Sequence, residues 1–203
     1  MNRISLLGCG KLGLPLGLQL IDRGYYVKGS TTTASKIDKF KQSGIIPYLL
    51  NIDKLVESDF FKSDILVLTL PYKKSFSDPN IYKNQIKRVC DSLKFSSIKH
   101  VVFTSSSSVY PKDAKLYLPT DKFIPPNIRA EILLDCEAVL NQLKNISVIT
   151  IRLGGIYGVG RTINKSKKNR RLIKQNDAIS LIKESIRRVG EHDCINGFTI
   201  MAV

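Results

Sequence analysis

The stretch Gly8-Cys9-Gly10-Lys11-Leu12-Gly13 follows a short apolar run at residues 4–7 and opens a segment that we expect to be helical as far as Asp22. In a GxGxxG turn between a strand and a helix, the first glycine permits the tight turn. The second lets the backbone approach a pyrophosphate, and the third lets the helix pack closely against the strand. The free N–H groups at the start of such a helix face the anion. Because the strand precedes and the helix follows, the motif predicts dinucleotide binding rather than a tight turn alone.

Apolar runs recur along the rest of the chain, with amphipathic segments between them. The runs that we interpret as strands are residues 26–28, 48–52, 65–70, 101–104, 148–153 and 198–203, and helical spacing is found in 82–93, 128–143 and 178–189. Several strand runs are apolar on consecutive residues, as a parallel sheet covered on both faces requires. The sequence therefore predicts an α/β fold, a doubly wound parallel sheet with strand order 3-2-1-4-5-6.

Composition and charge limit the function classes. A chain of 203 residues with 43% hydrophobic and 24% charged residues can build a core of one to one and a half domains. Its net charge of +15 favours anionic partners. The four cysteines are far apart and there are two histidines, so we expect no metal site and reduced thiols in the cytoplasm. No run approaches the roughly 20 apolar residues of a membrane span.

The end of the second strand indicates which dinucleotide is bound. An NAD site usually offers a carboxylate there, whereas an NADP site offers cations and hydroxyls for the 2′-phosphate. The segment at residues 29–36 reads GSTTTASK, and the first acid, Asp38, already belongs to the next helix. The segment favours NADP over NAD. Thr33 or Ser35 could equally cap that helix, and the two interpretations are compatible.

Two hydroxyl-bearing segments end the fourth and fifth strands. They read TLPY at residues 69–72 and TSSSSVYP at residues 104–111. Open α/β sheets hold their ligands at the carboxyl ends of their strands, so Thr104 and Ser105 join the predicted cofactor site. A hydroxyl there can also bond a carbonyl or alcohol that undergoes redox chemistry.

Together, GCGKLG at 8–13, VVFTSSSSVYP at 101–111 and IRLGGIYGVGR at 151–161 resemble the short-chain dehydrogenase/reductase superfamily, in its extended NAD(P)-dependent epimerase/dehydratase-like branch. The resemblance implies a Rossmann-type domain that acts on a nucleotide-sugar or a small carbonyl substrate. It implies that Gly8, Gly10, Lys11, Leu12 and Gly13 line the pyrophosphate and that Ser30, Thr31, Thr32 and Lys36 surround the ribose phosphate. It places Asp53 near adenine, and it places four residues along the cofactor: Leu70, Pro71, Gly154 and Gly155. It places Tyr157 and Arg161 on the substrate side and Ser106 at the catalytic Ser/Thr position.

The chain departs from this family at the YxxxK pair, whose lysine lowers the pKa of the proton-exchanging tyrosine. No tyrosine here is followed four residues later by lysine, and an Ala-Glu at 130–131 that resembles the family's helix aligns Phe123 and Asn127 with the pair. Tyr110 and, further along, Tyr117 and Lys122 are the nearest substitutes. We therefore expect Ser106 and Tyr110 to be the catalytic residues of an altered enzyme, or the chain to be a non-catalytic NADP sensor or scaffold.

The organisation of the chain leaves further alternatives. We expect a cofactor-binding domain at 1–160 and a reduced substrate region at 161–203, made of a basic loop, a helix and the last strand. The seven cations of residues 161–174 indicate a solvated linker or a phosphate site, whereas nucleic acid binding is disfavoured because no aromatic residues lie between them.

The GxGxxG and LTLP segments also occur in β-hydroxyacid dehydrogenases, which lack SSSSVYP. The family pairs its subunits through helices that correspond to 79–95 and 127–144, which implies a homodimer.

Overall fold

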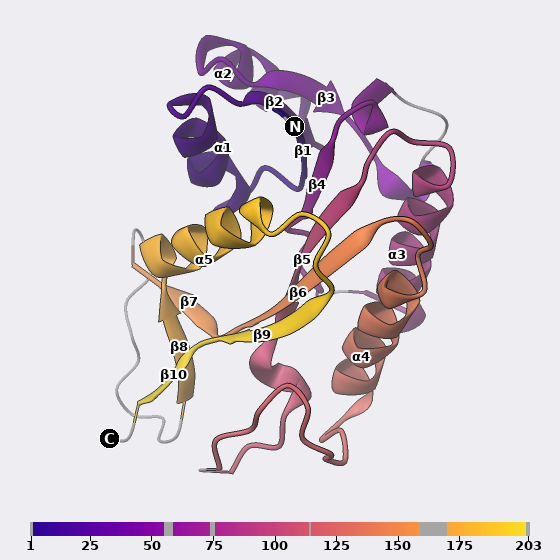
Figure 1. Ribbon diagram of the computed structural model, residues 1–203, viewed down its shortest axis with the longest axis vertical. Coiled ribbons are helices and arrows are strands. Elements are labelled where there is room, and N and C mark those ends of the chain that lie inside the picture. The colour runs from indigo at the N-terminus through magenta and orange to yellow at the C-terminus, as the bar shows by residue number, and fades with distance from the viewer. Residues whose placement is uncertain (1, 55–58, 74–75, 114, 159–169, 202–203) are drawn as a thin grey trace.

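The computed structural model describes residues 2–54, 59–73, 76–113, 115–158 and 170–201 (Figure 1). A seven-stranded sheet runs through it in the order β3-β2-β1-β4-β5-β6-β9, and every neighbouring pair is parallel. Its strands are β1 (Arg3–Leu7), β2 (Tyr26–Thr31), β3 (Ile46–Leu49), β4 (Ile65–Leu68), β5 (His100–Ser106), β6 (Ser147–Leu153) and β9 (Asp193–Gly197). The predicted order of the first six strands is confirmed, and β9 extends the sheet beside β6.

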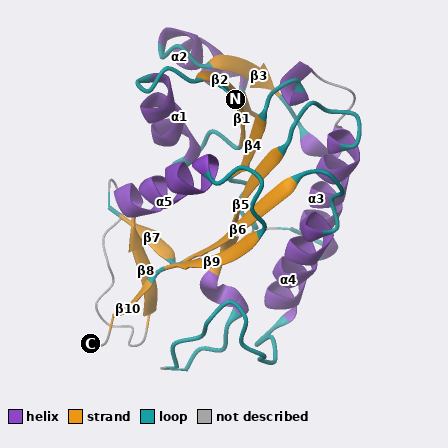
Figure 2. Ribbon diagram, in the orientation of Figure 1, coloured by secondary structure: helices purple, strands orange, loops and turns teal. Residues whose placement is uncertain are grey.

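Helices cover both faces of this sheet (Figure 2). On one face, α3 (Asn80–Leu93) and α4 (Ile128–Asn141) pack on β4 and β5 through residues such as Ile86 and Leu133. On the other, α1 (Gly13–Ile21), α2 (Ile37–Gln42) and α5 (Gln175–Arg187) bury residues such as Leu16, Phe40 and Ile182. The central strands β4 and β6 are buried along their whole length, because they have helices on both sides. The predicted doubly wound α/β fold is therefore confirmed.

Two strand boundaries differ from the prediction. The strand expected at 48–52 is β3 at Ile46–Leu49, and Ile52–Lys54 forms a 3₁₀ turn. Pro47 argues against a strand in the sequence, but β3 is an edge strand, where a missing N–H is tolerated. The strand expected at 198–203 is replaced by β9 at Asp193–Gly197, in the main sheet, and β10 (Thr199–Met201), outside it.

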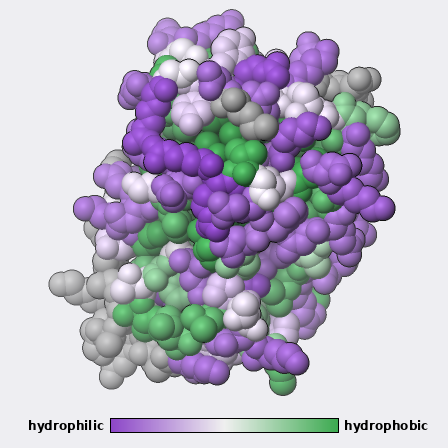
Figure 3. Space-filling model, in the orientation of Figure 1, coloured by the Kyte–Doolittle hydropathy of each residue, from purple (hydrophilic) through white to green (hydrophobic). Residues whose placement is uncertain are grey.

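A second, three-stranded sheet lies beside the main one (Figure 1). Its strands are β7 (Gly155–Tyr157), β8 (Arg170–Lys174) and β10, with β8 between the other two. The basic segment at 161–174, expected to be a solvated linker or a phosphate site, thus ends in the strand β8. Its residues 161–169, with the predicted substrate residue Arg161, lie outside the described residues. In the described part of the chain, no helix is long and apolar enough to cross a membrane. Hydrophilic residues cover most of the face seen in Figure 3.

Candidate functional site

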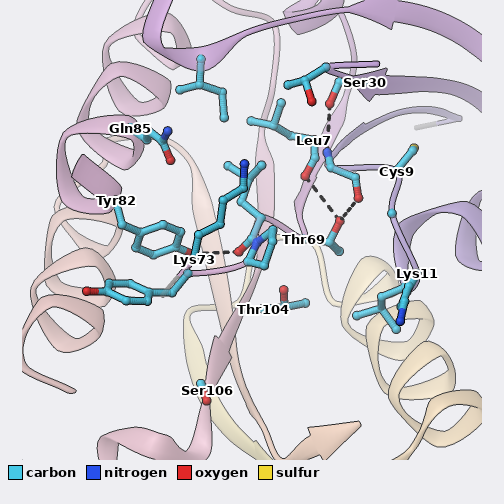
Figure 4. A pocket seen from close by; sticks show the side chains of 18 of the residues that line it. Leu7, Cys9, Lys11, Ser30, Thr69, Lys73, Tyr82, Gln85, Thr104 and Ser106 are labelled. Carbon is cyan, nitrogen blue, oxygen red and sulfur yellow. Dashed lines mark hydrogen bonds between the residues drawn. The ribbon is translucent and has the colours of Figure 1, made fainter. Parts of the chain in front are cut away.

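A cleft of about 720 Å³ opens at the carboxyl ends of strands β1 to β6, between the helices of the two faces. Figure 4 shows Lys73, Tyr82 and Gln85 on one side of it and Cys9 and Lys11 on the other, with Thr69, Thr104 and Ser106 between them. The predicted site residues that line the cleft are Gly8, Gly10, Lys11, Leu12, Ser30, Thr31, Thr32, Lys36, Asp53, Leu70, Pro71, Thr104, Ser105, Ser106, Gly154, Gly155 and Tyr157. The fold thus gathers predicted residues from six separate segments into one site.

The glycine turn between β1 and α1 has the geometry that a pyrophosphate needs. Gly8 has a φ of +106°, and a Cβ on Gly13 would lie 2.5 Å from the Gly8 carbonyl oxygen, so both positions require glycine. A Cβ on Gly10 would meet nothing within 4 Å, because this residue borders open space in the cleft. The N-cap residue of α1, Leu12, makes no side-chain capping hydrogen bond. The turn therefore fits a dinucleotide, with Gly13 as the residue behind the cleft that lets α1 pack.

Two hydrogen bonds from neighbouring strands hold this turn in place. The Gly8 N–H donates to Ser30 Oγ at 2.9 Å, and Thr69 Oγ1 donates to the Gly8 carbonyl oxygen at 2.7 Å (Figure 4). Ser30 therefore supports the turn, a role that the sequence comparison did not predict. Thr69 directly follows β4 and belongs to the TLPY segment, but it is not among the predicted site residues.

The end of β2 offers hydroxyls and a cation to the cleft. Thr31 Oγ1 accepts from the Thr33 N–H at 3.1 Å. Neither Thr33 nor Ser35 caps the following helical turns with its side chain, so the predicted capping is wrong. Thr32 and Lys36 are exposed and line the cleft. Among the described residues, Asp53 is the only acid in the lining, and Gln85 Nε2 donates to it at 3.0 Å.

At the end of β5, Ser106 keeps a hydroxyl proton available. Its Oγ accepts from the Ser108 N–H at 3.2 Å, at the start of the 3₁₀ turn Ser107–Val109. Thr104 Oγ1 instead donates to the Leu68 carbonyl oxygen at 2.9 Å, and Ser105 Oγ donates to Glu137. Of these three hydroxyls in the cleft lining, Ser106 is the one whose proton has no acceptor in the described part of the chain. It is therefore the one equipped to donate to a ligand.

A buried ion pair supports this end of the sheet from behind. Arg152 of β6 donates to Glu137 of α4 through Nε and, at 2.7 Å, through Nη2, and both side chains are at most 7% exposed. Arg152 Nη1 also donates to the Tyr110 hydroxyl at 2.8 Å, and that hydroxyl donates to Asn196 Oδ1. Ser105 lines the cleft and donates its hydroxyl to Glu137, so it connects the ion pair to the site. The network joins β5, β6, α4 and β9 at the base of the site.

Comparisons with known proteins agree with this geometry. Residues 3–116 match the family described as the NAD binding domain of 6-phosphogluconate dehydrogenase. The chain belongs to this family of NAD-binding domains. Protein YeeZ of Escherichia coli K12 is 33% identical over 167 residues, which cover 79% of this chain and only 61% of YeeZ. This NAD-binding chain therefore spans less than two thirds of that relative's length.

Solved structures share the fold of this NAD-binding chain over its whole length. The UDP-N-acetylglucosamine 4-epimerase of Bacillus cereus has a TM-score of 0.80 at 15% identity and is covered to 80%. MoeE5 in complex with UDP-glucuronic acid and NAD has a TM-score of 0.83 at 16% identity and is covered to 79%. The predicted resemblance to NAD-dependent epimerases and dehydratases is thus confirmed for the fold.

The structure does not bring Tyr110 to the cleft. Its ring is fully buried and stacked on Tyr117, and its hydroxyl is used by Arg152 and Asn196. Burial raises the pKa of this phenol. Tyr117, which donates to Asp113, and Lys122 are also absent from the cleft lining. Tyr110 therefore supports the fold and has no access to a ligand in the cleft.

The predicted alignment of Phe123 and Asn127 with a Tyr-Lys pair is wrong. Asn127 caps α4 by accepting the Ala130 N–H, and Phe123 packs 4.9 Å from the Tyr110 ring. The α4 residues that line the cleft are Arg129 and Leu133, one helical turn apart. Sequence reasoning missed Arg129, because the periodicity of α4 does not reveal how the helix is rotated toward the site.

The cysteine in the cleft lining is not a nucleophile at neutral pH. Cys9 is 4% exposed, and burial raises the pKa of its thiol to about 12. The thiolate is the reactive form, so this residue packs as a small apolar side chain. Groups of His, Cys, Asp and Glu that could hold a metal ion are not found among the described residues.

Proposed function

We propose that the cleft binds NADP(H) and that the chain is an oxidoreductase of the epimerase-like type, acting on a nucleotide-sugar or a small carbonyl compound. The observation that carries this proposal is the glycine turn of β1 and α1, which borders the open space of the cleft. A bound nicotinamide would supply the hydride donor or acceptor for such a reaction. Residues 1–160 would hold most of the cofactor, and Gln175 Nε2 closes the site from α5 by donating to the Lys11 carbonyl oxygen at 2.6 Å.

Charge at the end of β2 supports NADP over NAD in this proposal. Thr32 and Lys36 line the cleft there, and the carboxylate typical of an NAD site is missing from that strand end in the described chain. A phosphate bound there would gain a charge-assisted hydrogen bond from Lys36. The solved MoeE5 and epimerase complexes carry NAD, so the two nucleotides must be compared directly.

The test is a calorimetric titration of the purified protein with NADPH and with NADH. We expect NADPH to bind more tightly. Lys36→Glu should weaken NADPH at least about tenfold, which corresponds to about 1.4 kcal/mol, and leave NADH nearly unchanged. Lys39→Glu is the matched control, because Lys39 is exposed on α2 and outside the cleft lining. Binding of neither nucleotide would refute the proposal, and equal binding of both would refute the preference.

Ser106 is the residue that we propose as hydrogen-bond donor to the substrate oxygen. Its Oγ accepts a hydrogen bond from the Ser108 N–H, so the hydroxyl proton is left for another acceptor, such as a substrate oxygen. In a screen of nucleotide-sugars and small carbonyls with NADPH, Ser106→Ala should lower kcat by about 10²-fold or more with little change in cofactor affinity. An unchanged kcat would remove Ser106 from the reaction.

A non-catalytic NADP sensor or scaffold is the second candidate. The observation in its favour is that α4 presents Arg129 and Leu133 to the cleft, neither of which exchanges protons as a Tyr-Lys pair does. Tight NADPH binding without turnover of any substrate in the screen would support this candidate. Turnover that depends on Ser106 would exclude it.

A further inference from the structure

Arg129 lines the cleft and has no polar partner among the residues that the structure describes. It stands in the first turn of α4, and none of the hydrogen bonds or ion pairs found among the described residues involves its guanidinium. Its Nε is shielded from solvent and unbonded. By contrast, Arg152 and Arg171 have acceptors, the latter in the Pro111 carbonyl oxygen at 2.8 Å. A guanidinium carries five N–H donors, so this one has unused capacity beside a ligand cleft.

The surroundings of Arg129 hold the cation in place without neutralising it. Its guanidinium carbon lies 5.1 Å from the centre of the Tyr72 ring, and Leu133 is the next cleft residue along the same side of α4. An aromatic face attracts a cation but offers no acceptor oxygen. An apolar wall lowers the local dielectric constant, which strengthens attraction for an incoming anion. The subsite formed by Arg129, Tyr72 and Leu133 is therefore suited to an anionic group.

The position of Arg129 separates this subsite from the cofactor's phosphate contacts. The glycine turn and α1 pack on one face of the sheet, whereas α4 packs on the other (Figure 1). Lys11 and Lys36 lie with the turn and the end of β2, on the side where pyrophosphate and 2′-phosphate are proposed to bind. Ser106 ends β5, the strand on which α4 packs. An anion at Arg129 would thus lie on the α4 side of the cleft and belong to the second ligand.

We propose that Arg129 binds a carboxylate or phosphate group of the substrate. Arg129 and Leu133 lie one helical turn apart and line the cleft, which is the spacing that the missing Tyr-Lys pair would have. This inference rests on the proposed function, because the second ligand is defined by a bound cofactor. Arginine binds such anions through two parallel hydrogen bonds. It remains charged throughout, so Arg129 would orient the substrate and stabilise negative charge without supplying a proton.

The test titrates the NADPH-saturated protein with oxalate, inorganic phosphate and the neutral compound acetamide, followed by the amide signals in two-dimensional NMR spectra. We expect oxalate or phosphate to bind and acetamide not to bind. Arg129→Met should weaken binding of that anion at least tenfold, and Arg129→Lys should weaken it less, because lysine keeps the charge but loses the two-pronged geometry. The anion that binds more tightly assigns the substrate group as carboxylate or phosphate.

Two controls separate the subsite from general charge. Arg88→Met makes the same charge change on the exposed side of α3, away from the cleft, and should leave anion binding unchanged. An equal loss in Arg88→Met would show that the net charge of +15 attracts the anion, which overturns the proposal. NADPH affinity and the thermal unfolding midpoint of Arg129→Met should stay close to those of the parent.

The possible failures can be told apart. If NADPH does not bind the parent protein, the proposed function fails before any anion is added. If NADPH binds but neither anion does, only the assignment of Arg129 fails. If Arg129→Met weakens NADPH itself tenfold, Arg129 contacts the cofactor, and the assignment to a second ligand is also overturned.

Discussion

Replacing Glu137 by alanine should strip the buried Arg152 guanidinium of its counter-ion. The carboxylate accepts two donors of Arg152 and the Ser105 hydroxyl, and Glu137 is 5% exposed. Leaving one member of a buried pair unpaired costs about 3–5 kcal/mol. A domain is stable by only about 5–15 kcal/mol, so the loss is a large share of the total. For a chain of this size it corresponds to a fall of roughly 6–20 °C in Tm.

Urea unfolding followed by circular dichroism measures this loss. Glu131→Ala on the exposed side of the same helix is the control and should cost no more than about 1 kcal/mol. The double variant Glu137→Leu with Arg152→Met should lose less than Glu137→Ala, because it leaves no charge unpaired. A loss below about 1 kcal/mol in Glu137→Ala would refute the reasoning. So would a double variant whose loss equals the sum of the losses of Glu137→Leu alone and Arg152→Met alone.

Three further outcomes follow from single sites. Gly13→Ala should weaken NADPH at least about tenfold in calorimetry with an unchanged circular dichroism spectrum, because its Cβ would lie 2.5 Å from the Gly8 carbonyl oxygen and displace the turn; unchanged affinity would contradict the geometry. Burial lowers the pKa of His100, so the unfolded state takes up this proton first and stability should fall as the pH drops below about 6.5. His100→Gln should lose less stability than the parent between pH 7.5 and pH 5 in urea unfolding, and an identical loss would exclude His100 as the cause. Iodoacetamide at pH 8 should leave Cys9 and Cys136 unmodified in the folded protein, as mass spectrometry can check, because burial raises the pKa of each thiol to about 12; rapid labelling would show that either site opens.

The sequence predicts the parts of the fold whose burial repeats regularly. Strands β4 and β6 are buried on both faces, and their unbroken apolar runs indicate this directly. Strand β9 carries Asp193, Cys194 and Asn196, so no apolar pattern marks it, and among the described strands it pairs with β6 alone. Its place in the sheet depends on a neighbour far away in the sequence. A Cβ on Gly197 would lie 2.8 Å from Leu153 and Leu181 side-chain atoms, a closeness that only the folded chain reveals.

The cofactor side of the cleft is predictable for a related reason. The glycine turn is a local motif that six consecutive residues make recognisable in the sequence. The α4 side depends on the rotation of a helix, which tertiary contacts decide. No local rule shows that Arg129, rather than Phe123 or Asn127, lines the cleft at the strand ends.

The rotation of α4 follows from Glu137. This carboxylate is held by Arg152 of β6 and Ser105 of β5, so it fixes which side of the helix faces the ends of those strands. Residues four and eight positions earlier lie on the same side of a helix. Those residues are Leu133 and Arg129, and both line the cleft. An acid among the apolar positions of α4 and an arginine within the apolar run of β6 were therefore the signals that could have set the rotation. Because the same ion pair positions Arg129, Glu137→Gln should disturb anion binding in the cleft more than NADPH binding at the glycine turn.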